Sequence, residues 1–290
     1  MKQISLFLIL ALLICCFSGC RTDTPADIAA TTLPVYTFTA RLCQGTPLTV
    51  SRLVTESVSC LHDYTLQVGQ MRAIQGAQAV VISGAGLEEF LEDALHDADH
   101  IIDASQSLSL LEGDHHDHEH GGHVHAEDPH IWLSPENAKV MAHNICHGLL
   151  QLYPQYADTF HENLHTLEAD LDTLQAYGEE ALSNLSCREL ITFHDGFSYF
   201  AESFSLTIVK AVEEESGSEA SAAQLTELCR LVRDHNIPAI FTETNGSVSA
   251  AAIIAAETGT KVFTLDMAMS AGDYFEAMYQ NINTLKEALQ

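Results

Sequence analysis

The stretch "YPQYADTFHENLHTLEADLDTLQAYGEEALSNL", residues 153–185, lies in the middle of the chain between two sets of strand-like segments. Its apolar residues recur at spacings of three and four, with one longer gap, as an amphipathic helix requires. These residues are Phe160, Leu164, Leu167, Leu171, Leu174 and Leu182. A helix of about 28 residues would span roughly 42 Å, enough to cross two small domains. We therefore predict one connecting helix over 153–185.

Short β-branched runs lie on both sides of this stretch and alternate with longer helical patterns. The first four runs are 28–36, 48–54, 79–84 and 100–105, and the last four are 188–193, 206–212, 238–243 and 261–266. Such alternation is typical of βα units and parallel sheets. The sequence predicts an α/β protein of two lobes, each a small, mainly parallel sheet flanked by helices. The N-terminal lobe would cover 27–152 and the C-terminal lobe 186–290.

The N-terminus, "MKQISLFLILALLICCFSGC", combines one lysine, an apolar run and small residues before Cys20. This pattern predicts a secretory signal over 1–19, because the run is short for a membrane-spanning helix. The letters "FSGC" resemble the lipobox of bacterial lipoproteins, which implies acylation of Cys20 and a lipid-anchored linker over 20–26. We expect the mature protein to be extracytoplasmic and anchored to the cell membrane.

Composition limits the partners and the redox chemistry of the chain. It has 290 residues, 47% of them hydrophobic, and 12 basic against 40 acidic residues give a net charge of -28. This charge repels nucleic acids and favours cations as ligands. Five cysteines follow Cys20, an odd number, so at least one should stay free. Cys43 and Cys60 are close enough in sequence to pair, but their connectivity is left open.

Metal-capable side chains gather where the predicted strands end, which is where open α/β sheets bind ligands. These residues are His62, His130, His194, Glu243 and Asp266. Three imidazoles and a carboxylate suit zinc, which takes nitrogen and oxygen ligands tetrahedrally. Harder ions would require more oxygen ligands.

A second histidine pattern is the segment "GDHHDHEHGGHVHAEDPHIWLSP", residues 113–135. Ser134 and Pro135 have the pattern of an N-cap and first helical position, which would hold His130 rigidly. The other histidines fall in a polar, glycine-interrupted loop over 114–126: His115, His116, His118, His120, His123 and His125. We expect this loop to bind metal weakly and to raise its local concentration near the site. The alternative is a solvated insert with incidental affinity.

The stretch "HENLH", residues 161–165, matches the pattern by which zinc metalloproteases bind their metal. Along the connecting helix, however, His161 and His165 fall beside the apolar stripe and not within it. His143 and His147 have the same spacing and receive the same interpretation, as solvated surface residues. No convincing set of base and nucleophile accompanies them, so a secreted zinc hydrolase is an alternative and not the main expectation.

From about Asp27 onward the chain resembles the metal-binding solute-binding lipoproteins of bacterial ABC importers, which capture zinc or manganese outside the membrane. Five stretches carry the resemblance, in this order: "HDYTLQVGQMRAIQGAQAVVISGAGLEEFLEDAL", "DPHIWLSPENAKVMAHNI", "FHDGFSYFAESFSL", "AAETGTKVFTLD" and "YFEAMYQNINTLKEAL". The resemblance implies a metal site between two lobes with His62, His130, His194 and Asp266 as ligands.

The manganese members of that family carry glutamate where this chain has His194, so the resemblance is to the zinc branch. Family members usually read "LDP" at the fourth ligand, whereas residues 265–267 read "LDM" here. Glu243 and water are therefore kept as alternatives to Asp266.

The resemblance implies a protein that is not an enzyme and that binds zinc as transported cargo. We expect a monomer that delivers zinc to an ABC permease driven by its ATPase subunit. A manganese-binding or adhesin lipoprotein is the remaining alternative.

Overall fold

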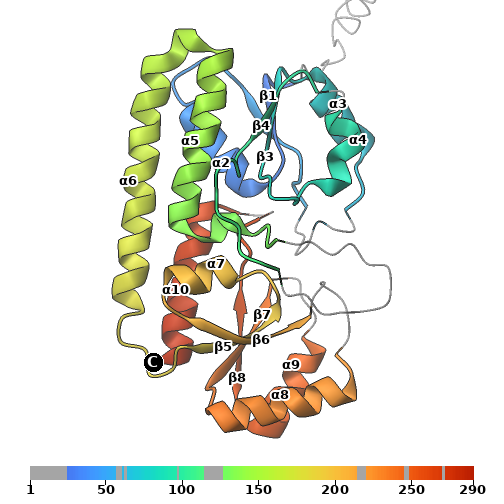
Figure 1. Cartoon of the computed structure of the whole chain (residues 1–290), viewed down its shortest axis with the longest axis vertical. Helices are drawn as coiled ribbons and strands as arrows, with labels where there is room; N and C mark the ends of the chain where they lie inside the picture. The colour runs from blue at the N-terminus through green and yellow to red at the C-terminus, as the bar shows by residue number, and fades with distance from the viewer. Residues whose placement is uncertain are drawn as a thin grey trace, which may run out of the picture.

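The computed structural model describes residues 25–56, 61, 64–96, 98–113, 127–213, 220–244, 248–269 and 272–290. The predicted signal, Cys20, Cys60, His62 and the histidine loop 114–126 lie outside these residues. The described chain contains two four-stranded sheets, ordered β2-β1-β3-β4 and β6-β5-β7-β8, and every strand pairing in them is parallel. The predicted α/β fold with two parallel-sheet lobes is confirmed (Figure 1).

The N-terminal sheet is built from short strands, of which β1 and β3 are the most buried. Its strands are β1 (Ile28–Ala30), β2 (Val50–Arg52), β3 (Ala79–Ile82) and β4 (Ile101–Asp103). The helical elements that follow them are α2 (Leu33–Leu42), α3 (Val68–Gly76), α4 (Glu92–Leu95) and the 3-10 turn η1 (Glu89–Leu91).

The first predicted strand, 28–36, is too long, because the strand ends at Ala30 and a helix begins at Leu33. Thr32 has the extended backbone of an N-cap, and Pro34 occupies the first turn of α2. Proline is well suited to the first turn, where its missing N–H has no helical partner to lose. The β-branched composition of this run therefore did not decide its structure.

The C-terminal sheet has longer strands and carries more of the predicted site residues. Its strands are β5 (Glu189–His194), β6 (Thr207–Glu213), β7 (Ala239–Glu243) and β8 (Lys261–Leu265). Its helices are α7 (Ser198–Ser203), α8 (Ala222–His235), α9 (Ser249–Thr258) and α10 (Tyr274–Leu289). His194 and Glu243 are the last residues of neighbouring strands, so both lie at the carboxyl edge of this sheet.

The connecting helix is shorter than predicted. The helix α6 covers Ala157–Ala181, after the 3-10 turn η3 (Pro154–Tyr156) and the preceding helix α5 (Pro135–Leu152). Pro154 separates α5 from α6, because proline disfavours helical conformation in the residue before it. Figure 1 shows α6 running beside both lobes, with α5 and α10 packed against it. The predicted apolar stripe of this helix is buried, as expected.

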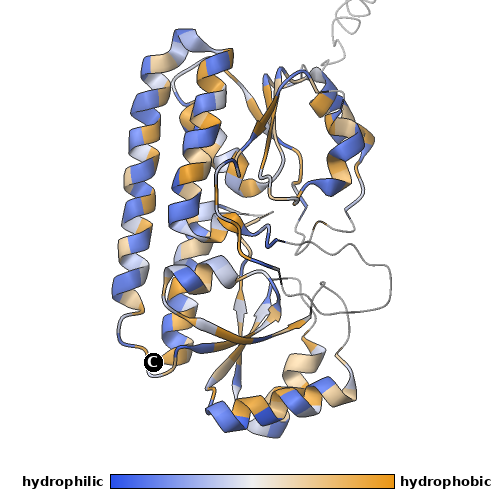
Figure 2. Cartoon of the chain, in the orientation of Figure 1, coloured by the Kyte–Doolittle hydropathy of each residue, from blue (hydrophilic) through white to orange (hydrophobic). Residues whose placement is uncertain are grey.

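One hydrophobic core joins the two lobes. It includes β-strand residues of both sheets, the stripe of α6 and the buried face of α10, and it extends from Ile28 to Leu289. Each lobe also has one smaller hydrophobic cluster under its outer helices. Figure 2 shows hydrophobic residues concentrated on the strands, while α6 and α8 carry hydrophobic and hydrophilic residues in alternation.

Two further expectations concern the membrane and the cysteines. Within the described residues, no helix combines the length and the hydropathy needed to cross a membrane. Cys43, Cys146, Cys187 and Cys229 form no disulfide with one another. The possible bridge between Cys43 and Cys60 stays open, because Cys60 is outside the described residues.

Candidate metal centre

Two histidines from different lobes meet at the carboxyl edge of the C-terminal sheet. His194 ends β5, and His130 precedes the 3-10 turn η2 (Ile131–Leu133) that leads into α5. Their Nε2 atoms lie 3.3 Å apart, and their rings are perpendicular. Both residues are buried, since His130 is 5% exposed and His194 is 3% exposed. The structure thus brings two of the predicted ligands together.

The carboxylate of Asp128 fixes the ring of His130. Its Oδ1 accepts from the backbone N–H of His130 at 2.9 Å and lies 2.8 Å from Nδ1 of the same residue. When Nδ1 donates this hydrogen bond, the neutral ring carries its lone pair on Nε2. That lone pair faces His194. The helix start behind His130 is also as predicted, because Ser134 accepts from the N–H of Asn137 and Pro135 is in the first turn.

His194 is held by a close backbone approach and by a second carboxylate. A side chain at Gly196 would place its Cβ within 3.0 Å of both imidazole rings and of Met267. Glycine is therefore required where the chain passes the two rings. Oε2 of Glu243 lies 3.9 Å from Nδ1 of His194, beyond hydrogen-bond length but close enough for electrostatic attraction.

The separation of the two nitrogens matches a tetrahedral zinc ion. Nitrogen ligands lie about 2.0–2.1 Å from zinc, so two of them at the tetrahedral angle are about 3.3 Å apart. The distance between Nε2 of His130 and Nε2 of His194 has this value. The two side chains could therefore bind zinc with little movement.

Asp266 follows β8 and is held by its neighbours in the C-terminal lobe. Its Oδ1 accepts from the N–H of Ala268 at 2.7 Å, and its backbone exchanges two hydrogen bonds with the side chain of Asn281. Among the described residues, no group of three or more His, Cys, Asp or Glu side chains is arranged to hold a metal. Asp266 thus follows a strand of the sheet that also carries His194, but the structure does not group its side chain with His130 and His194.

The loop after Asp266 connects the lobes. Nε1 of Trp132 donates to the carbonyl of Met267 at 2.7 Å, and the hydroxyl of Tyr274 donates to the carbonyl of Trp132 at 2.8 Å. The N–H of Leu33, at the start of α2, donates to the carbonyl of Met269 at 2.8 Å. These bonds fix the segment 267–269 against the N-terminal lobe. Met267 is part of this contact through its carbonyl.

The histidines of the protease-like pattern are on the surface. His161 and His165 are exposed on α6, as predicted from their place beside the apolar stripe. His143 is exposed on α5 and pairs with Glu168 at 2.6 Å, and His147 is exposed one turn later. Both pairs are exposed, whereas His130 and His194 are buried.

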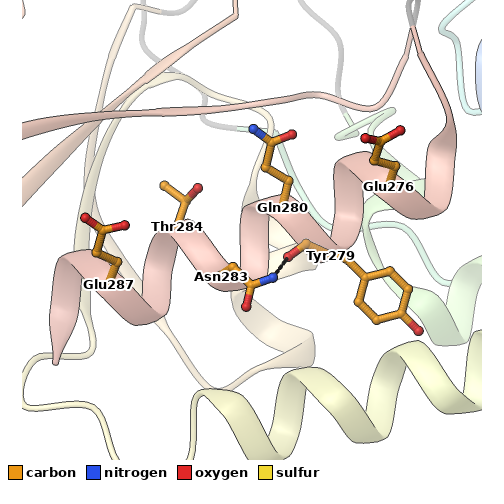
Figure 3. Close-up of a pocket in the computed structure, with 6 residues that line it drawn as sticks. All are labelled: Glu276, Tyr279, Gln280, Asn283, Thr284 and Glu287. Atoms are coloured by element: carbon orange, nitrogen blue, oxygen red, sulfur yellow. Dashed lines mark hydrogen bonds between the residues drawn. The ribbon is translucent and has the colours of Figure 1, made fainter.

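A shallow hollow lies on one helix, α10. Figure 3 shows Glu276, Gln280, Thr284 and Glu287 pointing from one face of this helix, while Tyr279 turns toward α6. The ring of Tyr279 stacks edge-on against Tyr177 with centroids 5.1 Å apart. All lining residues come from one element, and they include no group of three or more His, Cys, Asp or Glu side chains.

Comparison with known proteins gives the family. The sequence profile described as "Zinc-uptake complex component A periplasmic" (ZnuA) matches residues 28–288. A protein of Treponema pallidum (strain Nichols) named as metal-binding is 29% identical over 99% of this chain and 97% of its own length. The zinc-binding lipoprotein AdcA of Streptococcus pneumoniae (strain ATCC BAA-255 / R6) is 31% identical over 99% of this chain. This chain spans 61% of the length of that relative.

Solved structures agree. A crystal structure of ZnuA superimposes with a TM-score of 0.79 at 30% identity, covering 91% of this chain and 100% of the other. A ZnuA deletion mutant with zinc bound gives a TM-score of 0.77 at 30% identity, covering 91% and 98%. The laminin-binding protein Lbp of Streptococcus pyogenes gives 0.77 at 25% identity, covering 91% and 100%.

Two parallel-sheet lobes on a helical spine, with paired imidazoles between them, define a substrate-binding protein for a metal ion. The chain belongs to the ZnuA family of zinc-uptake components. Its members are metal carriers and not enzymes, so the hydrolase alternative is set aside. Zinc is the ion that the names of the family and of its relatives give.

Proposed function

We propose that this chain captures one zinc ion between its lobes through His62, His130, His194 and Asp266, and passes it to an ABC permease. The observation that carries this proposal is the pair of buried Nε2 atoms 3.3 Å apart, one from each lobe. Two imidazoles at this separation favour a small tetrahedral ion over larger ions that prefer oxygen. His62 and Asp266 would complete the site.

The position of Glu243 argues against it as a fourth ligand. It lies beside Nδ1 of His194, whereas Nε2 of the same ring faces His130. A carboxylate beside the outer ring nitrogen commonly orients a histidine that binds metal through the inner one. We therefore assign Glu243 to the orientation of His194 and keep Asp266 as the ligand.

The family and the sequence support a proposal for delivery and location. We propose that acylated Cys20 anchors the mature chain to the outside of the cell membrane, as a monomer. The permease and its ATPase subunit would supply the energy, since the sequence contains no nucleotide-binding motif. The histidines of residues 114–126 would gather zinc weakly near the site, raising its local concentration.

The test is zinc titration of the mature, metal-free chain in competition with a chelator and with manganese. We expect one tight zinc ion and weaker manganese binding. X-ray absorption of the zinc-bound protein should show about four nitrogen or oxygen neighbours at roughly 2.0–2.2 Å, with imidazole scattering. Sulfur neighbours, or tighter binding of manganese than of zinc, would contradict the proposed site.

A further inference from the structure

The described residues on either side of the histidine loop form a small closed structure. Leu111 and Glu112 lie before the loop, and Glu127 and Asp128 lie after it; we call these four residues the loop base. Glu112 and Glu127 form an antiparallel bridge, and the N–H of Asp128 donates to the carbonyl of Leu111 at 2.9 Å. The two chain segments therefore lie side by side where they enter and leave the loop.

One tyrosine from the C-terminal lobe joins both segments of the loop base. The hydroxyl of Tyr199 accepts from the N–H of Leu111 at 2.9 Å and donates to the carbonyl of Asp128 at 3.0 Å. Tyr199 belongs to α7 and is 2% exposed. A single phenol oxygen thus satisfies a donor and an acceptor of the N-terminal lobe.

The contacts of Tyr199 continue to both metal-binding histidines. Asp128 uses its backbone carbonyl for Tyr199 and its carboxylate for His130. On the other side, α7 follows His194 in the chain, and Gly196 packs against both imidazole rings between them. Tyr199 therefore lies where the segment carrying His130 meets the segment carrying His194.

We propose that Tyr199 is a positioning residue that holds the loop base on α7 and so keeps Nε2 of His130 in register with Nε2 of His194. This inference rests on the proposed function, because it assigns a role relative to that same zinc site. It adds a residue that would act on the site through Asp128 and α7 and not as a ligand. It also ties the chain ends of the histidine loop to the site itself.

The chemistry of the hydroxyl suits this role. Burial raises the pKa of Tyr199 to about 12, so the hydroxyl keeps its proton near neutral pH and remains a donor to Asp128. Phenylalanine would fill the same space but would leave the N–H of Leu111 and the carbonyl of Asp128 without this partner. Buried polar groups that lose a partner are costly, so the metal-free variant should relax around the loop base. Zinc binding would then have to restore the register, and the loss would appear as weaker affinity.

The experiment compares Tyr199→Phe with Tyr153→Phe in the mature chain. Tyr153 is a matched control, since it is also buried and its hydroxyl donates to Gln78 at 3.3 Å. Gln78 immediately precedes β3, so this hydrogen bond lies at the amino edge of the N-terminal sheet. Zinc affinity is measured by chelator competition, and ligand geometry by the visible absorption of the cobalt-substituted protein. We expect Tyr199→Phe to weaken zinc binding about tenfold and to change the cobalt spectrum. The control should change neither.

A residue that only stabilised the fold would lower the melting temperature of the metal-free protein and leave the cobalt spectrum unchanged. The inference is overturned by that result, by zinc affinity within about twofold of the wild type, or by an equal loss in the control. His130→Ala is measured in parallel. If it retains tight zinc, the proposed function itself fails; if it loses zinc while Tyr199→Phe does not, the inference alone fails.

Discussion

His161 and His165 lie four residues apart on α6, whereas His130 and His194 are separated by 64 residues in the chain. The first pair has the spacing of a known zinc motif, yet both of its side chains are exposed. The second pair has no local motif, yet its nitrogens meet in a buried position between two lobes. Spacing along one helix sets which side chains share a face, but burial and outer partners decide whether that face can hold a metal tightly.

The largest expected effect is the loss of one member of the buried pair. His194→Ala should abolish tight zinc binding, with a loss greater than the roughly 10- to 100-fold typical of removing an outer partner of a ligand. His130→Ala should behave alike. Zinc affinity by chelator competition is the measurement, and His161→Ala is the matched control on the exposed pair. If His194→Ala or His130→Ala retained tight zinc binding, the contrast between the buried and the exposed histidine pairs would be wrong.

A smaller effect is expected from the carboxylate that orients His130. Asp128→Asn keeps the shape of the side chain but removes the charge that strengthens its hydrogen bond to Nδ1. Zinc affinity should fall by about 10- to 100-fold. Asp172→Asn on α6, which alters a surface pair with Lys139, should leave affinity unchanged. Equal affinities in the two variants would mean that Asp128 does not tune the site.

The third prediction concerns pH and the scaffold of the N-terminal lobe. Glu88 is buried and accepts hydrogen bonds from the hydroxyl of Thr31 and from the N–H groups of Ser83 and Gly84. Burial, with a smaller contribution from the negative charge of Asp103, raises the pKa of Glu88 to about 7 against the opposing effect of these hydrogen bonds.

Between its ordinary pKa and pH 7, the folded protein keeps the proton of Glu88 while the unfolded chain releases it. The contribution of Glu88 to the free energy of unfolding should therefore fall as pH rises through this window. Glu88→Gln cannot titrate and should lack this slope. Urea unfolding of the metal-free wild type and variant at several pH values measures the difference. Parallel pH dependences in the two proteins would contradict the raised pKa.

No change in zinc affinity is expected from substitutions in the exposed pair on α6. Replacing both His161 and His165 by alanine, or Glu162 by glutamine, should leave tight zinc binding as it is in the wild type, because these side chains are exposed on α6. The measurement is the same chelator competition. A loss of tight binding in either variant would show that the exposed pair, and not only the buried pair, contributes to the site.

Much of the fold could be predicted from periodicity. Eight strand runs, the two lobes and the buried stripe of α6 follow from local patterns of apolar residues, which determine which face each element buries. Boundaries were less predictable where proline intervened. Pro34 turned the end of the first run into a helix start, and Pro154 begins the turn η3, so the helix expected from residue 153 begins only at Ala157.

The site was predictable in part. Strand ends pointed to His194, and the Ser134–Pro135 helix start pointed to a fixed His130, because both signals are local. Asp128 and Gly196 were missed as partners of these rings, since their roles depend on contacts between distant segments. Asp128 could have been noticed from its place two residues before His130. The ligand roles of His62, His130, His194 and Asp266 remain predictions.

The hydrophobic core that runs from Ile28 to Leu289 determines how zinc binding should change the thermal unfolding of the chain. Because both lobes share this core, they should melt together in one transition and not one after the other. A ligand that binds only the native state stabilises by RT ln(1 + [L]/Kd), and here that gain would belong to the whole chain. The melting temperature reported by a probe in either lobe should then rise with zinc concentration. The melting temperature would therefore measure how much of the protein has zinc bound.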